Sequence, residues 1–161
     1  MDAYLDIETT GLSPWRDSIT VFGIYRQVPA GYELIQIIGN RIDEQAVMRS
    51  LEGVRRLYTY NGTRFDLVFI EMKLGIPLGS MMVHRDLMYD CWNQGLRGGF
   101  KAVEHCLGIP RKLRGVDGRR AVELWWRYVN HDDPRALQTL LKYNREDVEN
   151  LKELRDRLRV A

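Results

Sequence analysis

Hydrophobic and polar residues alternate in three short segments near the amino terminus, as they do in β-strands that bury one face. The segments are residues 3–8, 18–25 and 33–38, and glycine and proline turn signals separate them. Strands that follow one another so closely predict a meander at the start of the chain.

From residue 43 onward the hydrophobic spacing becomes that of amphipathic helices, interrupted by two further apolar runs. The expected elements are a helix at 43–51, a strand at 57–60, a helix at 65–74, a fifth strand at 82–87 and a long helix at 134–158. A meander followed by crossovers predicts an α/β fold whose mixed five-stranded sheet is flanked by helices.

Candidate chemistry begins in the first strand, where Asp6 and Glu8 are two residues apart. Side chains two apart on a strand point to the same face, while Leu5 and Ile7 pack on the other side. The strand therefore presents paired carboxylates, which can bind a divalent cation. A solvated strand face explains the same pattern.

A third carboxylate, Asp66, lies in the first turn of a predicted helix, just after the turn signal Asn61-Gly62. An acidic residue there complements the helix dipole, and Thr63 and Asp66 have the spacing of a capping box. Asp66 is therefore a candidate ligand with a structural alternative.

The last candidates, Tyr143 and Asp147, lie one helical turn apart in the long C-terminal helix. Asp147 falls at the edge of the apolar stripe of this helix, where a carboxylate is costly to desolvate unless it has a partner or a metal. The alternative is a residue at the rim of a solvated helix, with Lys142 or Arg145 as its neighbour.

The order of these segments is more specific than any one of them. Asp-x-Glu at 6–8, Asn-x-x-x-Phe-Asp at 61–66 and Tyr-x-x-x-Asp at 143–147 resemble the three motifs of the DEDD superfamily of 3′–5′ exonucleases, in the tyrosine-containing DEDDy branch. Residues 121–126 and 143–151 also look like the stand-alone RNase H-like group that includes the YprB-type proteins.

This resemblance implies an RNase H-like fold and a hydrolase that releases nucleoside 5′-monophosphates from the 3′ end of DNA or RNA. Asp6 would bridge two divalent cations, Mg²⁺ or Mn²⁺, while Glu8 and Asp147 would complete the site of the cation that holds the attacking water. Asp66 would serve the second cation, and Tyr143 would orient the water. Four carboxylates so close together repel one another, so we expect coupled titration without cations.

The same resemblance assigns substrate contacts to the segment after the first motif. Leu12 would wedge beside the terminal base, and backbone groups from Thr9 to Gly11 would face the terminal sugar. Asn61 could align the nucleic-acid strand near the second motif. Packing at the strand exit is the alternative for Leu12, and an Asn-Gly turn by itself explains Asn61.

Positive charge is concentrated between residues 108 and 120, in a glycine-punctuated segment that carries Arg111, Lys112 and Arg114. We expect a mobile loop that holds the backbone phosphates of single-stranded nucleic acid or of a duplex 3′ end. A solvated loop that only keeps the protein soluble is the alternative. The formal net charge of the whole chain is only +2, so the charge is local.

Length and composition fit a single domain over residues 1–161. No apolar run is long enough to cross a membrane, and the first strand begins too early for a signal peptide. Cys91 and Cys106 lack metal-ligand spacing and fit reduced thiols. We therefore expect a cytoplasmic protein with no membrane partner.

Two other functions stay open besides an exonuclease. One is an RNase H-like structure-specific endonuclease that uses the same cations, and the other is a catalytically silent module that binds nucleic-acid ends. Residues 84–87 copy the start of a protein-kinase catalytic loop, but Cys91 stands where that motif needs asparagine, and a glycine-rich phosphate loop is missing. The sequence therefore disfavours a kinase.

Overall fold

The computed structural model describes residues 1–160, and its elements follow the order expected from the sequence. The strands are β1 (Asp2–Thr9), β2 (Ile19–Val28), β3 (Gly31–Ile38), β4 (Arg56–Thr59) and β5 (Val83–Asp86). The helices are α1 (Glu44–Ser50), α2 (Asp66–Leu74), α3 (Leu78–Met81), α4 (Leu87–Asn93), α5 (Phe100–Leu107), α6 (Gly118–His131) and α7 (Pro134–Leu158), with a 3₁₀ turn η1 (Gly39–Arg41). None of the helices in residues 1–160 is both long and apolar enough to span a lipid bilayer.

The strands within these residues form a five-stranded sheet in the order β3-β2-β1-β4-β5. β1 pairs antiparallel with β2 and parallel with β4. The outer pairs are β2 with β3, antiparallel, and β4 with β5, parallel. The predicted α/β fold with a mixed sheet is therefore confirmed, and β1 is its central strand.

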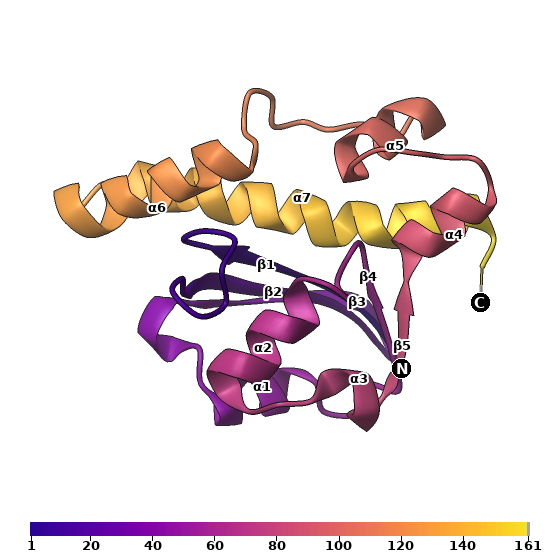
Figure 1. The fold of residues 1–161 in the computed structure, drawn as a ribbon, viewed down its shortest axis with the longest axis horizontal. Helices are drawn as coiled ribbons and strands as arrows, with labels where there is room; N and C mark the ends of the chain where they lie inside the picture. The colour runs from indigo at the N-terminus through magenta and orange to yellow at the C-terminus, as the bar shows by residue number, and fades with distance from the viewer. Residues whose placement is uncertain (161) are drawn as a thin grey trace.

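Helices cover both faces of the sheet. In Figure 1, α7 runs across one face with α6 beside it, and α1, α2 and α3 lie on the opposite face. Leu5 and Ile7 of β1 belong to the hydrophobic core shared with α1 and α2, whereas Tyr4 belongs to the core shared with α7. Because side chains alternate along a strand, Asp6 and Glu8 lie on the same side as Tyr4, under the long helix.

The turn after β4 is held by Asp86, the last residue of β5. Its carboxylate accepts hydrogen bonds from the backbone N–H groups of Asn61 (2.7 Å) and Thr63 (3.0 Å), and it caps α4 through the N–H of Met88 (3.2 Å). Asn61 has a left-handed backbone (φ 61°), so the Asn-Gly turn signal is confirmed. The aspartate of the kinase-like segment thus has a structural role.

Candidate active site

Three acidic side chains converge on the face of β1 that lies under α7. Asp6 and Glu8 come from β1 and Asp147 from α7, and one carboxylate oxygen of each lies within 4.8 Å of those of the other two. Glu8 and Asp147 are buried, and Asp6 is partly exposed. The structure therefore brings together motifs from opposite ends of the chain.

Asp66, the first residue of α2, is buried beside the same strand and binds its backbone. Its Oδ1 accepts a hydrogen bond of 3.0 Å from the N–H of Ile7, which lies between the two acids of β1. β4 pairs with β1 only as far as Tyr4. Beyond that point the Asp66 carboxylate, not a strand, accepts the hydrogen bond from the backbone N–H of Ile7. The capping box with Thr63 does not form, because Phe65 is the N-cap of α2.

Asn144, which the sequence reasoning missed, holds Asp6 in place. Its Nδ2 donates to the backbone oxygen of Asp6 (3.1 Å) and to the carboxylate Oδ2 (3.2 Å), and its Oδ1 accepts from Gln36 Nε2 (2.9 Å). Gly23 of β2 leaves room for this amide, because a Cβ there would lie 2.0 Å from Asn144 Oδ1. The available signals were an asparagine beside Tyr143 and a glycine inside a predicted strand.

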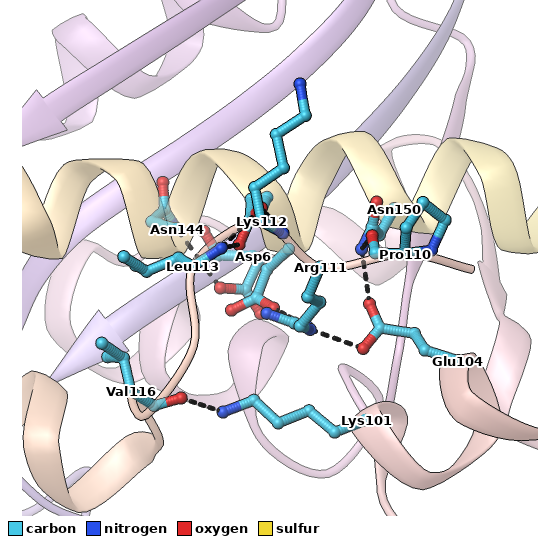
Figure 2. A network of polar contacts seen from close by, with 12 residues as sticks. Asp6, Lys101, Glu104, Pro110, Arg111, Lys112, Leu113, Val116, Asn144 and Asn150 are labelled. Atoms are coloured by element: carbon cyan, nitrogen blue, oxygen red, sulfur yellow. Dashed lines mark hydrogen bonds and ion pairs between the residues drawn. The ribbon is translucent and has the colours of Figure 1, made fainter. Parts of the chain in front are cut away.

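Arg111 pairs with one of the three converging acids, Asp147, and this contact was also missed. Its Nη2 donates to Asp147 Oδ1, and its Nε donates to Glu104 Oε2 at 2.6 Å. Glu104 is only 2% exposed, and its other oxygen accepts from Asn150 Nδ2 at 2.8 Å. Figure 2 shows the Arg111 side chain extending from its loop toward Glu104. The structure thus places Arg111 inside the site, not on an exposed surface.

The basic segment that carries Arg111 differs from the mobile loop expected from its sequence. The Glu146 carboxylate of α7 accepts from the backbone N–H of Lys112 (2.6 Å), and Lys101 Nζ of α5 donates to the carbonyl of Val116. The side chains of Lys112 and Arg114 are exposed. Composition could not reveal these anchors, because the groups that make them lie on α5 and α7, outside the segment.

Tyr143 lies on α7 one turn before Asp147, and its buried ring lines a cleft that Asp6 and Asp147 also line. Lys101 Nζ lies 4.7 Å and the Arg111 guanidinium carbon 5.8 Å from the ring centroid, as in cation–π contacts. Burial, followed by the charge of Asp147, raises the pKa of the phenol. The hydroxyl therefore stays protonated at neutral pH and can donate a hydrogen bond.

Burial raises the pKa of each of the four acids. For Asp6 and Glu8 the pKa lies well above the ordinary value, because burial and then the charge of Asp147 disfavour ionisation. Burial raises the pKa of Asp66 to about 7, against the effect of its backbone hydrogen bonds. Burial also raises the pKa of Asp147 to about 6, although the Arg111 charge opposes the rise. The positive charge present in the site is therefore too small to keep all four acids ionised.

The donor set fits hard divalent cations. Carboxylate oxygens suit Mg²⁺ or Mn²⁺, whereas zinc prefers nitrogen and sulfur ligands. Glu8 Oε1 is buried without a hydrogen-bond partner in the described part of the chain, and a cation would satisfy it. The cleft lined by Tyr143 has a volume of about 370 Å³ and lies against two of the acids, Asp6 and Asp147. Its lining includes Asp6, Tyr60, Phe100, Lys101, Arg111, Tyr143 and Asp147.

The residues expected to contact the end of a substrate lie in the turns after β1 and β4. Leu12 is 85% exposed, so packing at the strand exit does not explain it. The Thr9 hydroxyl donates to the Gly11 carbonyl at 2.6 Å and holds the first turn. Asn61 lies in the second turn and is partly exposed.

The chain was compared with models of known protein families and with curated proteins. The sequence model of the RNase H superfamily matches residues 3–159. No curated protein matches the chain.

Solved structures share the fold at low sequence identity. The family B DNA polymerase from the hyperthermophilic archaeon Pyrobaculum calidifontis matches with a TM-score of 0.71 and 17% identity over 98% of this chain, which spans only 24% of the polymerase. Brucella melitensis NrnC matches with a TM-score of 0.61 and 21% identity, over 98% of this chain and 71% of its own. NrnC bound to pGG and NrnC with bound Mg²⁺ each match with a TM-score of 0.52 and 19% identity, over 98% of this chain and 83% of theirs.

Proposed function

The chain belongs to the RNase H superfamily, and on that premise we propose that it is a metal-dependent 3′–5′ exonuclease that releases nucleoside 5′-monophosphates from DNA or RNA. The observation that carries the proposal is the convergence of Asp6, Glu8 and Asp147 within 4.8 Å. Acids gathered at one buried place are costly unless they bind cations. Hydrolysis of a phosphodiester between two divalent cations uses such a site.

Asp6, Glu8, Asp147 and Asp66 are the residues that would hold two divalent cations, Mg²⁺ or Mn²⁺. The unpartnered Glu8 Oε1 and the raised pKa values of the acids support this assignment. When bound, such cations activate the attacking water and stabilise the leaving oxygen. The structure of NrnC with bound Mg²⁺ supports a cation of this kind on the same fold.

The other residues of the cleft would position the reacting groups. The protonated Tyr143 hydroxyl would donate to the nucleophilic water and orient it toward the phosphate. Asn144 would keep the Asp6 carboxylate in one orientation through its 3.2 Å hydrogen bond. The hydrogen bond from the backbone N–H of Ile7 to Asp66 Oδ1 would keep the Asp66 carboxylate beside β1.

The substrate that we propose is the 3′ end of a single strand or of a duplex, bound by residues 1–161 acting as one domain. The exposure of Leu12 supports its role as a wedge beside the terminal base. The structure of NrnC bound to pGG supports nucleic acid as a ligand of this fold. The proposed substrate contacts are the backbone and side chains of Thr9, Gly11, Leu12, Asn61, Lys112 and Arg114.

A time course on end-labelled single- and double-stranded DNA and RNA, with Mg²⁺, Mn²⁺ or EDTA, tests the proposal. We expect mononucleotides to be released from 3′ ends only when a divalent cation is present. Cleavage that persists in EDTA, or label released first from 5′ ends, would refute the proposed activity. Cutting of a covalently closed circle would favour an endonuclease, and binding without turnover would favour a silent end-binding module.

The variant Asp6→Asn ties this activity to the acidic site. It removes a charged ligand at constant shape, so turnover should disappear while the circular dichroism spectrum stays that of the wild type. Asp156→Asn is the matched control, because Asp156 is exposed and pairs with Lys152 of the same helix at 2.5 Å. Near-normal activity of Asp6→Asn would show that the cation site is elsewhere.

A further inference from the structure

Arg111 takes up part of the negative charge that divalent cations would need. Its guanidinium pairs with Asp147, one of the three acids whose oxygens converge, and with Glu104. The side chain of Arg111 is only 14% exposed, so water does little to weaken these contacts. Asp6 lines the same cleft as Arg111. Arg111 therefore acts as an internal counter-ion of the acidic site.

The hydrogen-bonding capacity of Arg111 is not fully used in this arrangement. Nε and Nη2 have carboxylate partners, whereas Nη1 is buried and has no partner among residues 1–160. A buried charged donor without an acceptor is rare in folded proteins because its desolvation is uncompensated. The guanidinium can therefore accept a further anion, and its side chain lines the cleft against the acids.

The backbone on both sides of Arg111 is held, so any second position must be reached by the side chain alone. Asn150 Nδ2 donates to the Pro110 carbonyl at 3.3 Å, and the N–H of Lys112 donates to Glu146 at 2.6 Å. An arginine side chain has several rotatable bonds and can change partner without moving its backbone.

Glu104 offers a fixed point for such a movement. It is buried and held by Asn150 at 2.8 Å, and it accepts from Nε of Arg111 at 2.6 Å. The guanidinium carbon of Arg111 lies 5.6 Å from the ring centroid of Phe100 and 5.8 Å from that of Tyr143. Flat aromatic faces attract a guanidinium without fixing its rotation in the plane, so these contacts tolerate a turn of the group.

From these contacts we infer that Arg111 is an exchangeable counter-ion and a catalytic residue. Its Nη2 holds Asp147 while the acids carry no divalent cation. Once cations occupy the acids, the guanidinium turns about its contact with Glu104 and donates through Nη1 and Nη2 to the phosphate of the bound nucleic-acid end. Glu104 acts through Arg111 and is a positioning residue. The inference rests on the proposed function, because it takes a nucleotide phosphate as the second anion.

A purely structural role for Arg111 and its role as an exchangeable counter-ion predict opposite effects of its loss on cation binding. If the ion pair only kept Asp147 in place, its loss would misplace a ligand and weaken cation binding. If Arg111 is exchanged for cations, its loss removes a competing positive charge and strengthens cation binding. The same loss weakens binding of the nucleotide phosphate, so the two affinities change in opposite directions.

Calorimetric titrations of Arg111→Gln and wild type, first with Mn²⁺ alone and then with a nucleoside 5′-monophosphate at saturating Mn²⁺, measure both affinities. We expect the variant to bind Mn²⁺ roughly 5-fold more tightly. We expect it to bind the nucleotide about 10- to 100-fold more weakly, since a charge-assisted contact is lost. Weaker binding of Mn²⁺, or an unchanged affinity for the nucleotide, would overturn the inference.

Further variants separate position from charge. Arg145→Gln removes an exposed arginine of α7 that pairs with Glu149 at 2.7 Å, and it should change neither affinity. Glu104→Gln should weaken nucleotide binding in the wild-type background and add little in the Arg111→Gln background. An equal effect in both backgrounds would show that Glu104 does not act through Arg111.

Arg111→Lys carries the test if the glutamine variant does not fold. It keeps the charge beside Asp147 but replaces the planar donors with a single ammonium. Its affinity for Mn²⁺ should stay near that of the wild type while its affinity for the nucleotide falls, and an unchanged nucleotide affinity would contradict the inference. These titrations need no turnover, so a protein that binds both ligands but cleaves nothing would refute the exonuclease proposal alone.

Discussion

Tyr143 combines a packed aromatic ring with a hydroxyl group that has a separate proposed role. Its ring packs beneath Lys101 and Arg111, and its hydroxyl is the group assigned to the attacking water. Tyr143→Phe keeps the ring and removes one hydrogen bond, so the single-turnover rate should fall roughly 10- to 1000-fold. The affinity for Mn²⁺, measured by titration, should barely change. Equal rates for the two proteins would reduce Tyr143 to a packing residue.

The close approach of α7 to β2 at Gly23 lets Asn144 reach Asp6. Gly23→Ala would place a Cβ 2.0 Å from Asn144 Oδ1, so the helix or the strand must shift. We expect a loss of about 1–3 kcal/mol in the free energy of unfolding and a lower rate, because Asn144 holds Asp6. Urea denaturation and a single-turnover assay measure these effects.

Gly79→Ala is the control for that substitution. A Cβ at Gly79 would meet Leu67 at 3.4 Å, an ordinary contact, and the position is helical. This variant should be as stable and as active as the wild type. If Gly23→Ala behaved in the same way, the packing of α7 on β2 would not control the site.

The segment between α5 and α6 can be tested by its dependence on salt. Lys112 and Arg114 are exposed and are assigned to backbone phosphates, so changing both to alanine should raise KM for a single strand. The slope of log affinity against log salt should flatten by about 1.4, because each contact contributes about 0.7. The rate at saturating substrate should stay constant.

The double variant Lys152→Ala and Arg157→Ala, near the C-terminal end of α7, is the control for this prediction. An unaltered salt slope for the Lys112 and Arg114 variant would mean that the segment is only solvated surface.

The whole molecule should lose stability when its buried acids ionise. The pKa of Asp66 is raised to about 7 and that of Asp147 to about 6, so the folded protein binds more protons than the unfolded chain between about pH 4 and pH 7. Without divalent cations, the melting temperature should therefore fall as the pH rises from about 5 to 8. Mg²⁺ should restore it at the upper end, because cations bind the ionised acids of the folded state.

Differential scanning calorimetry in EDTA and in Mg²⁺ at several pH values checks this prediction. Asp66→Asn should reduce the pH dependence, because one of the shifted groups is gone. A melting temperature in EDTA that rises steadily from pH 5 to pH 8 would show that ion pairs elsewhere outweigh the acidic site.

Local patterns were sufficient for much of the architecture. The alternation of residues 3–8 predicted both a strand and the common face of Asp6 and Glu8, since side-chain direction repeats every two residues. The apolar spacing and Pro134 predicted the bounds of α7. The Asn-Gly turn at residue 61 was also predicted, because asparagine and glycine tolerate the left-handed backbone that it needs.

Periodicity and backbone preference within short windows were thus enough for the five strands, for α1, α2 and α7, for the mixed sheet, and for the common face of Asp6 and Glu8. Three contacts of the site became visible only in the folded chain: Asn144 holds Asp6, Asp66 binds the backbone of β1, and Arg111 pairs with both Asp147 and Glu104. Each of these contacts joins segments far apart in the chain. Such a contact depends on which faces meet when helices pack on the sheet, and no local pattern contains that information.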